Sequence, residues 1–154
     1  MARSIKEFSG KHRFLSNFHE HPKGLLWRGV TAPTVEHHFQ GYKTIEGSER
    51  EWVLEAPTPI KAKRRGQRVT LRPEWDDIRL GVMAELIHTK FEDRELRKLL
   101  DDTGNATLIE GNSRHDTFWG RCDCDEHEFR GYNWLGRLLT IERSRRRFDI
   151  APPF

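Results

Sequence analysis

Glu36, Gln40 and Lys43 form a pattern that could do chemistry. In a helix, which turns about 100° per residue, their side chains fall within roughly 60° of one another, one turn apart. Val35 and Phe39 belong to an adjacent apolar stripe that could pack against a core. A carboxylate, an amide and an amine beside an apolar stripe suit the wall of a polar pocket. The same pattern is common on surface helices with solvated charges, so spacing alone leaves both interpretations open.

Glu36 and Lys43 together have the functional groups needed to break an N-glycosidic bond. A carboxylate can move protons or stabilise an oxocarbenium-like state. An amine whose pKa is lowered by burial from about 10.4 can attack an anomeric carbon and form a Schiff base. The sequence does not show whether Lys43 is buried.

The segment 114–120 is a second candidate site. Asp116 lies three residues before Trp119, next to Phe118 and Gly120. Aromatic rings stack on bases and carboxylates bind sugar hydroxyls, so these residues indicate a nucleobase or sugar clamp. Gly120 would let the backbone approach a ligand closely. In the alternative interpretation, Phe118 and Trp119 only anchor a loop to the core.

Cys122, Cys124 and His127, with His115 upstream, could be drawn as a four-ligand zinc site. Structural zinc sites usually have about two to four residues between paired cysteines, and no second cysteine pair exists here. We therefore expect no metal. The sequence also has no glycine-rich phosphate loop of a standard type and no Ser or Cys nucleophile with a recognisable local signature.

Length and composition restrict the class of protein. The 154 residues are 35% hydrophobic and 33% charged, and nine Phe and five Trp argue against disorder. No apolar run is long enough to span a bilayer, the N-terminus lacks the apolar region of a signal peptide, and two cysteines are too few for a disulfide framework. We expect a cytoplasmic protein with no membrane partner; nothing in the sequence indicates its oligomeric state.

Two basic clusters, residues 61–68 and 143–147, stand out in a chain whose net charge is only +3. That net charge is too small to imply a polyanionic partner. The second cluster is typical of a solvated helix end, where cations interact favourably with the helix dipole. Phosphate contact is the alternative for either cluster.

The sequence predicts an α+β fold that is mostly helical, with a few short strands, as one compact domain (1–148) with a loose tail (149–154). Thr34 is expected to cap the N-terminus of a central helix that Gly47 ends. The longest helix is expected over 73–91, because apolar residues recur there at steps of three and four. The other expected elements are strands at 5–8, 25–27 and 107–110, loops at 14–18 and 113–133, and helices at 48–54, from 58, at 93–100 and at 134–145.

Motifs along the whole chain resemble the NADAR (YbiA-like) family. They are 14–18 (Phe-Leu-Ser-Asn-Phe), 34–43 (Thr-Val-Glu-His-His-Phe-Gln-Gly-Tyr-Lys), 62–66 (Ala-Lys-Arg-Arg-Gly), 72–75 (Arg-Pro-Glu-Trp), 109–112 (Ile-Glu-Gly-Asn), 118–120 (Phe-Trp-Gly) and 133–139 (Asn-Trp-Leu-Gly-Arg-Leu-Leu), with the pairs 82–83, 90–91, 96–97 and 103–104. They occur in the family's order and cover about residues 6–145. In the segment 121–130, where many relatives have a short glycine-rich turn, this chain has an acidic insertion with two cysteines, which is either a surface loop or a lip that shapes substrate choice.

The resemblance implies N-glycosidase chemistry on ribosylated compounds. One branch of the family hydrolyses ribosylaminopyrimidine phosphates of the riboflavin pathway, and another removes ADP-ribose from guanine in DNA. By residue-by-residue match, Lys43 and Glu36 are expected to be catalytic. The expected substrate-binding residues are Asn17, Gln40, Trp75, Asn112, Asp116, Phe118, Trp119 and Gly120, with Lys63, Arg64 and Arg65 as candidates for phosphate binding.

The function that we expect is removal of ADP-ribose from guanine in DNA, through a Schiff base on Lys43 with assistance from Glu36. The alternatives are hydrolysis of riboflavin-pathway intermediates and a non-catalytic module that binds ADP-ribose or nucleotides. The Glu36–Lys43 pair favours an enzyme, since a pure binding module would not require it. A general nucleic-acid-binding protein is disfavoured by the low net charge and the lack of a known binding motif. No metal or redox cofactor is expected.

Overall fold

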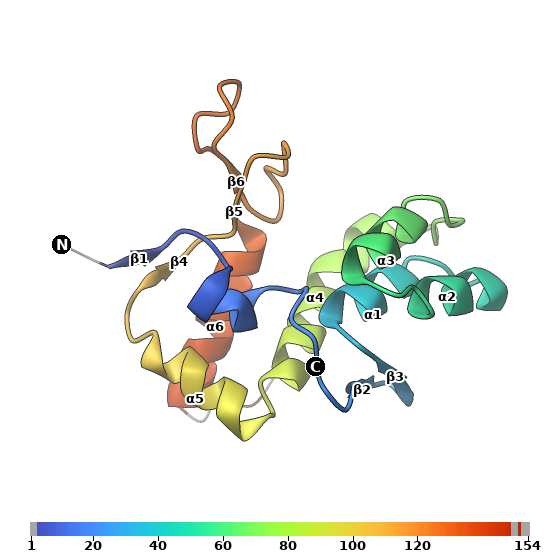
Figure 1. The fold of residues 1–154 in the computed structure, drawn as a ribbon, viewed down its shortest axis with the longest axis horizontal. Helices are drawn as coiled ribbons and strands as arrows, with labels where there is room; N and C mark the ends of the chain where they lie inside the picture. Colours follow the sequence, from blue (N-terminus) through green and yellow to red (C-terminus); the bar gives the residue numbers. More distant parts are fainter. Residues whose placement is uncertain (1–2, 149–150, 152–154) are drawn as a thin grey trace. The chain divides into compact units, whose positions relative to one another are not determined.

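The computed structural model describes residues 3–148 and residue 151. The fold is α+β and mostly helical with short strands, as predicted from the sequence (Figure 1). The chain divides into two units, one of residues 17–90 and one in which residues 3–16 join residues 91 onward. Except for Ala151, the predicted tail lies outside the described residues.

The unit of residues 17–90 is built around α1 (Val35–Gly41). α1 contacts α2 (Gly47–Leu54), α3 (Pro59–Gly66) and α4 (Trp75–Lys90). Every residue of α1 is buried, including its carboxylate and both histidines. The surface-helix interpretation is therefore wrong, and the polar side chains of α1 lie inside the unit.

A tight hairpin precedes α1. Strands β2 (Leu25–Trp27) and β3 (Val30–Ala32) pair in antiparallel fashion, with Arg28 and Gly29 at positive φ between them. Two consecutive residues at positive φ are typical of the two-residue turns that match the twist of a hairpin. The Trp27 indole N–H donates to Glu85 Oε2 (2.8 Å), which ties the hairpin to α4.

Threonine side chains set the starts of two helices, as the sequence indicates. The Thr34 hydroxyl accepts from the His37 N–H at the start of α1, and the Thr58 hydroxyl accepts from the Lys61 N–H at the start of α3. Pro59 follows Thr58 at the first helical position, where its missing N–H costs nothing.

α1 ends at Gly41, well before the predicted end at Gly47, and Lys43 lies beyond the helix. Contacts from the segment before α4 account for the early end. The Arg72 N–H donates to the Lys43 carbonyl (2.8 Å), and the Arg72 guanidinium lies 4.0 Å from the centre of the Tyr42 ring. Such tertiary contacts override local helix propensity. α4 likewise begins at Trp75, two residues later than predicted.

The other unit combines the N-terminal segment with the second half of the chain. Strand β1 (Ser4–Ile5) pairs in parallel with β4 (Thr107–Leu108), and β5 (Gly111–Asn112) pairs in parallel with β6 (Arg121–Cys122). α6 (Trp134–Arg147) packs on β4 and on α5 (Arg94–Asp102), and α5 also contacts the 3₁₀ helix η1 (Gly10–Leu15). The strand predicted at 5–8 is shorter than expected, and the loop predicted at 14–18 begins inside η1.

The arginines at the end of α6 hold this unit together. Arg143 is 5% exposed and donates to the Thr103 hydroxyl (2.7 Å) and the Ala106 carbonyl (3.0 Å). Arg147 donates to Asn105 Oδ1 (2.9 Å) and to the Gly104 carbonyl (3.1 Å). The basic cluster 143–147 is therefore neither a simple solvated helix end nor a free phosphate contact, because these two arginines bind the turn that follows α5.

Among the described residues, the structure has no helix that is both long and apolar enough to span a membrane.

Candidate active site

Glu36 and Gln40 form a buried polar pair inside the unit of residues 17–90. Their residues are 6% and 4% exposed, and Gln40 Nε2 donates to Glu36 Oε1 at 2.7 Å. The Glu36 N–H donates to the Asn17 carbonyl (3.1 Å), which fixes the first turn of α1 against the segment before the hairpin. The carboxylate therefore occupies one well-defined position on α1.

Lys43 reaches the same region from the segment just after α1. Its N–H donates to the Gln40 carbonyl (3.3 Å), and its carbonyl accepts from the Arg72 N–H (2.8 Å), so its backbone is held on both sides. The residue is half-buried. Sequence spacing predicted that Glu36 and Lys43 lie close together; the Glu36 carboxylate is near enough to influence the pKa of the Lys43 amine, although Lys43 is not on the helix.

Burial lowers the pKa of the Lys43 amine below its usual value. The Glu36 carboxylate acts in the opposite direction, since a nearby negative charge favours the ammonium form. The cations Lys63 and Arg79 add to the lowering. The net result is an amine with a larger neutral fraction than an ordinary lysine has, and the neutral form is the nucleophile.

The side-chain oxygen of Gln40, Oε1, is buried without a hydrogen-bond partner among the described residues. The amide orientation follows from Glu36, because only the Nε2 group can donate to the carboxylate. α3 approaches this amide with its backbone: a Cβ at Gly66 would overlap the Gln40 side chain. A buried acceptor with no donor costs roughly 1–3 kcal/mol, so the close approach of α3 to this amide comes at a cost in stability.

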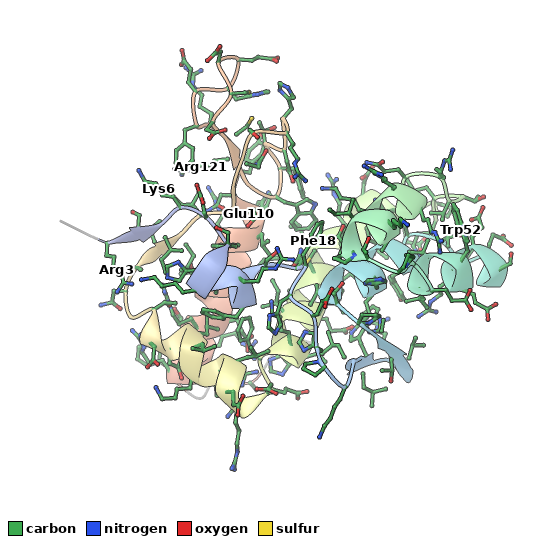
Figure 2. All side chains as sticks on the ribbon, viewed as in Figure 1. Arg3, Lys6, Phe18, Trp52, Glu110 and Arg121 are labelled. Carbon is green, nitrogen blue, oxygen red and sulfur yellow. The ribbon has the colours of Figure 1, made fainter. Side chains whose placement is uncertain are left out.

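The three predicted phosphate-binding residues of α3 lie in different surroundings. Lys63 is close enough to influence Lys43, and Arg64 is exposed. The Arg65 guanidinium donates to the Trp52 carbonyl and lies 5.1 Å from the centre of its ring, on α2 (Figure 2). Lys63 thus lies near Lys43, whereas Arg65 packs α3 on α2.

Trp75 and Asn17 contact residues of α1, the helix that carries the polar pair. Trp75 is 4% exposed and its ring lies 4.9 Å from that of Phe39, so it packs α4 against α1. The Asn17 side chain donates to Met83 Sδ (3.5 Å), while its carbonyl receives the Glu36 N–H. These contacts give both residues a structural role; their contact with a substrate stays a prediction.

His37 and His38 are fixed by the core, as their adjacent positions on a helix imply. His37 Nδ1 pairs with the Thr34 hydroxyl (2.8 Å) and its Nε2 donates to the Ala56 carbonyl (2.8 Å). His38 Nε2 donates to the Leu25 carbonyl (2.8 Å). Burial lowers the pKa of both imidazoles, so both are neutral near pH 7.

The loop that follows β5, in the other unit, contains the remaining predicted substrate residues. The Asn112 side chain organises it: Oδ1 accepts from the Arg114 and Asp116 N–H groups, and Nδ2 donates to the carbonyls of Asp116 and Arg121. Asp116 Oδ1 in turn accepts from the N–H groups of residues 118 (3.1 Å) and 119 (2.9 Å). These polar groups serve the loop's own backbone, which presets its shape.

Phe118 and Trp119 lie half-exposed with their rings 4.9 Å apart, edge to face. Their carbonyls accept from the first N–H groups of α6, which pins the loop to that helix. Gly120 is needed because a Cβ there would overlap the Glu110 carbonyl. The close approach at Gly120 is therefore to the protein's own backbone, and aromatic contact with a base stays a prediction.

Arg79, Asn133 and Gly136 have structural surroundings that were not predicted from the sequence. Arg79 lies one turn after Trp75 on α4, a spacing that could have placed it near α1. Asn133 accepts from the Glu110 N–H and donates to the Leu108 carbonyl, and a Cβ at Gly136 would overlap that carbonyl. The motif Asn-x-x-Gly thus joins α6 to β4.

Comparison with known proteins gives one consistent family. The model of the NADAR domain matches residues 5–147. The N-glycosidase YbiA of Shigella flexneri serotype 5b (strain 8401) is 36% identical over 127 residues, which are 80% of this chain and 75% of that protein. A riboflavin biosynthesis protein of Vibrio vulnificus (strain YJ016) is 35% identical over 135 residues, which cover 86% of this chain and 35% of that protein. The NMR structure of YbiA from Escherichia coli is similar with a TM-score of 0.78, at 32% identity over 97% of this chain and 88% of that one.

Proposed function

Because the chain belongs to the NADAR family, we propose that it removes ADP-ribose from ADP-ribosylated guanine in DNA, with Lys43 and Glu36 as the catalytic pair. The general reaction class is shared with its relatives. The chain is an N-glycosidase, an enzyme that hydrolyses a bond between an anomeric carbon and a nitrogen. The observation that carries the assignment of residues is a half-buried lysine with a lowered pKa beside a buried carboxylate.

The neutral Lys43 amine attacks the anomeric carbon of the ribose and forms a C–N bond as the bond to the base nitrogen breaks. The Lys43 nitrogen, positively charged after the attack, gives up a proton to the Glu36 carboxylate, and the carboxylic acid so formed passes that proton to the leaving base. The ribosylated lysine opens to a Schiff base when the ring oxygen leaves as a hydroxyl. Water then adds to the imine carbon, which releases the sugar aldehyde and restores the amine.

Gln40 supports the Glu36 carboxylate in this proposal. Its Nε2 holds the carboxylate in place through the 2.7 Å hydrogen bond. Its Oε1 is buried against Gly66 of α3, so Gln40 acts on the substrate only through Glu36.

Charge on α3 and α4 supports an anionic substrate. Lys63 and Arg79 influence the Lys43 amine, so both lie near the reacting centre. Further along α3, Lys61 and Arg64 are exposed. Cations both near the centre and on the outer surface fit a ligand with several phosphates, such as a pyrophosphate attached to a DNA strand.

A second substrate is favoured by a different observation. A relative that is 35% identical is named a riboflavin biosynthesis protein. By this analogy the chain would release ribose 5-phosphate from a ribosylaminopyrimidine, with the same bond broken by the same residues. A single phosphate would need only the cations close to Lys43.

The test compares both substrates with wild-type protein and the variants Lys43→Arg and Glu36→Gln. Lys43→Arg keeps the positive charge but cannot form a Schiff base, and Glu36→Gln keeps the shape without the carboxylate. We expect turnover of an oligonucleotide with ADP-ribosylated guanine to fall at least 100-fold in both. Borohydride should trap a sugar adduct on Lys43 of the wild type, and Lys23→Ala serves as the control because that lysine is exposed in the same unit.

Each result has a distinct meaning. Turnover of the ribosylaminopyrimidine phosphate alone would replace the first substrate by the second. Normal turnover by Lys43→Arg would refute the Schiff base. Tight ADP-ribose binding with no turnover of either substrate would show a binding module instead of an enzyme.

A further inference from the structure

Four metal-ligating side chains converge in the segment that follows β5. The Sγ atoms of Cys122 and Cys124 and the ring nitrogens of His115 and His127 all lie within 4.8 Å of one another. Cys124 Sγ lies 2.9 Å from Cys122 Sγ, 3.0 Å from His127 Nδ1 and 3.5 Å from His115 Nδ1. Residues up to twelve positions apart in sequence therefore present two sulfur and two nitrogen donors to one point.

We propose that these four residues bind a structural zinc ion. Tetrahedral zinc, with Zn–S near 2.3 Å and Zn–N near 2.0–2.1 Å, places its donor atoms about 3.3–3.8 Å apart. Two of the three separations from Cys124 Sγ are shorter than that range, the third falls within it, and no pair exceeds 4.8 Å, so small side-chain rotations would bring all four atoms to bonding distance. Two thiolates and two imidazoles form a closed site for zinc, since soft sulfur ligands disfavour magnesium and calcium.

The expectation of no metal came from the one-residue spacer between the cysteines, and the backbone shows why that spacer suffices. The Phe129 N–H donates to the Cys122 carbonyl (2.7 Å), and the Glu128 N–H donates to the Cys124 carbonyl (2.9 Å). This turn carries His127 back beside the cysteines. His115 has φ = 61°, and the loop organised by Asn112 brings its ring beside Cys124 and 5.4 Å from the His127 ring.

The segment also has few buried residues. Of residues 113–131, only Gly120 and Cys122 are buried. In Figure 1 this orange segment projects from β5 and β6 beyond the helices of its unit. A projection with almost no core is the situation in which small proteins use a metal or a disulfide as a cross-link.

Zinc content is the direct test. The full chain would be purified without a polyhistidine tag from zinc-supplemented cultures, dialysed against metal-free buffer and analysed by mass spectrometry for metals. We expect about one zinc ion per chain. Cys124→Ser and His127→Ala should lose most of it, while Asp125→Asn, an exposed acid between these ligands, should keep it.

Cobalt provides a second readout on the reduced wild-type protein. Zinc replaced by Co²⁺ should give the visible bands of a tetrahedral ion and a near-ultraviolet thiolate charge-transfer band, both absent in Cys124→Ser. His115→Ala tests the fourth ligand at an exposed position, where misfolding does not confuse the result. Three results would overturn the proposal. The first is a wild-type chain without stoichiometric zinc or these bands, and the second is a Cys122–Cys124 disulfide in place of the metal. The third is equal zinc in Cys124→Ser, which would show an adventitious ion only.

The site has a consequence for the loop between its ligands. Asp116, Phe118 and Trp119 lie between His115 and Cys122, so zinc would restrain this loop at both ends.

Discussion

The Lys43 amine is under two opposed influences. Burial disfavours the ammonium form, whereas the Glu36 carboxylate stabilises it, and the burial effect prevails. Lys63 and Arg79 act in the same direction as burial. A nucleophilic lysine needs its neutral form, so these charges bear directly on the rate at a given pH.

The rate of adduct formation should therefore rise with pH and level off below about 10.4, the ordinary value for a lysine. Glu36→Gln removes the charge that raises the pKa of Lys43, so the rise should move to lower pH. Lys63→Ala removes a charge that lowers this pKa, so the rise should move to higher pH. Borohydride trapping followed by mass spectrometry at a series of pH values measures both shifts. Shifts in the same direction would contradict the electrostatic assignment.

The residue types at positions 36, 40 and 43 were enough to suggest the chemistry, but their burial was not visible in the sequence. A seven-residue helix with no exposed residue looks, from its spacing alone, like an amphipathic surface helix. The unpartnered Gln40 Oε1 depends on the approach of α3, a contact between residues far apart in sequence. The sequence also offered His115, Cys122, Cys124 and His127 as a possible zinc site, but only the structure shows that their donor atoms converge.

At the scale of elements, the approach of α3 to α1 depends on one position. A Cβ at Gly66 would overlap the Gln40 side chain, which is held by its hydrogen bond to Glu36. α3 and α1 can therefore be this close only with glycine there. The same distance between helices determines where Lys63 lies relative to Lys43.

Gly66→Ala should destabilise the protein by about 1–3 kcal/mol, as overpacking of a buried contact usually does. It should also reduce turnover, because Gln40 and Glu36 must move. Gly81→Ala is the matched control: a Cβ there meets nothing within 4 Å, and alanine in a helix interior should stabilise by up to about 1 kcal/mol. Urea denaturation and turnover of the two variants give the comparison. Equal stability of the two would show that α3 shifts freely.

Elements with a local cause were predicted well. Thr34 and Thr58 start their helices through their own side chains, and α4 follows its apolar periodicity. The errors lie where distant residues decide the outcome. α1 stops at Gly41 because of contacts from Arg72, and the strand near Ile5 depends on a partner at Leu108.

At the scale of the whole molecule, charge is distributed unevenly. The net charge is +3, yet Arg143 and Arg147 are bound to the turn after α5. The exposed cations of α3 are therefore better placed for contact with a polyanion than those of α6. This distribution is invisible in the sum of charges.

Binding of the oligonucleotide should weaken as the salt concentration rises, so log K falls against log salt. Each of the α3 variants Lys61→Ala and Arg64→Ala should make this negative slope shallower by about 0.7–0.9. Lys98→Ala, an exposed lysine on α5, should leave the slope unchanged. Hydrolysis of the ribosylaminopyrimidine phosphate should be indifferent to both α3 changes. Fluorescence anisotropy at several salt concentrations provides the slopes. Unchanged slopes in both variants would show that α3 does not contact the DNA.

The pairing of β1 with β4 has a consequence for the order in which the protein is made. Residues 17–90 are contiguous and can fold as soon as they leave the ribosome, but Ser4 pairs with Thr107 and must wait for most of the chain. During this interval Ser4 and Ile5 have no strand to pair with, and their backbone groups can pair with another nascent chain. Arg3 and Lys6 flank it, and their like charges repel a second copy until the native strand arrives (Figure 2).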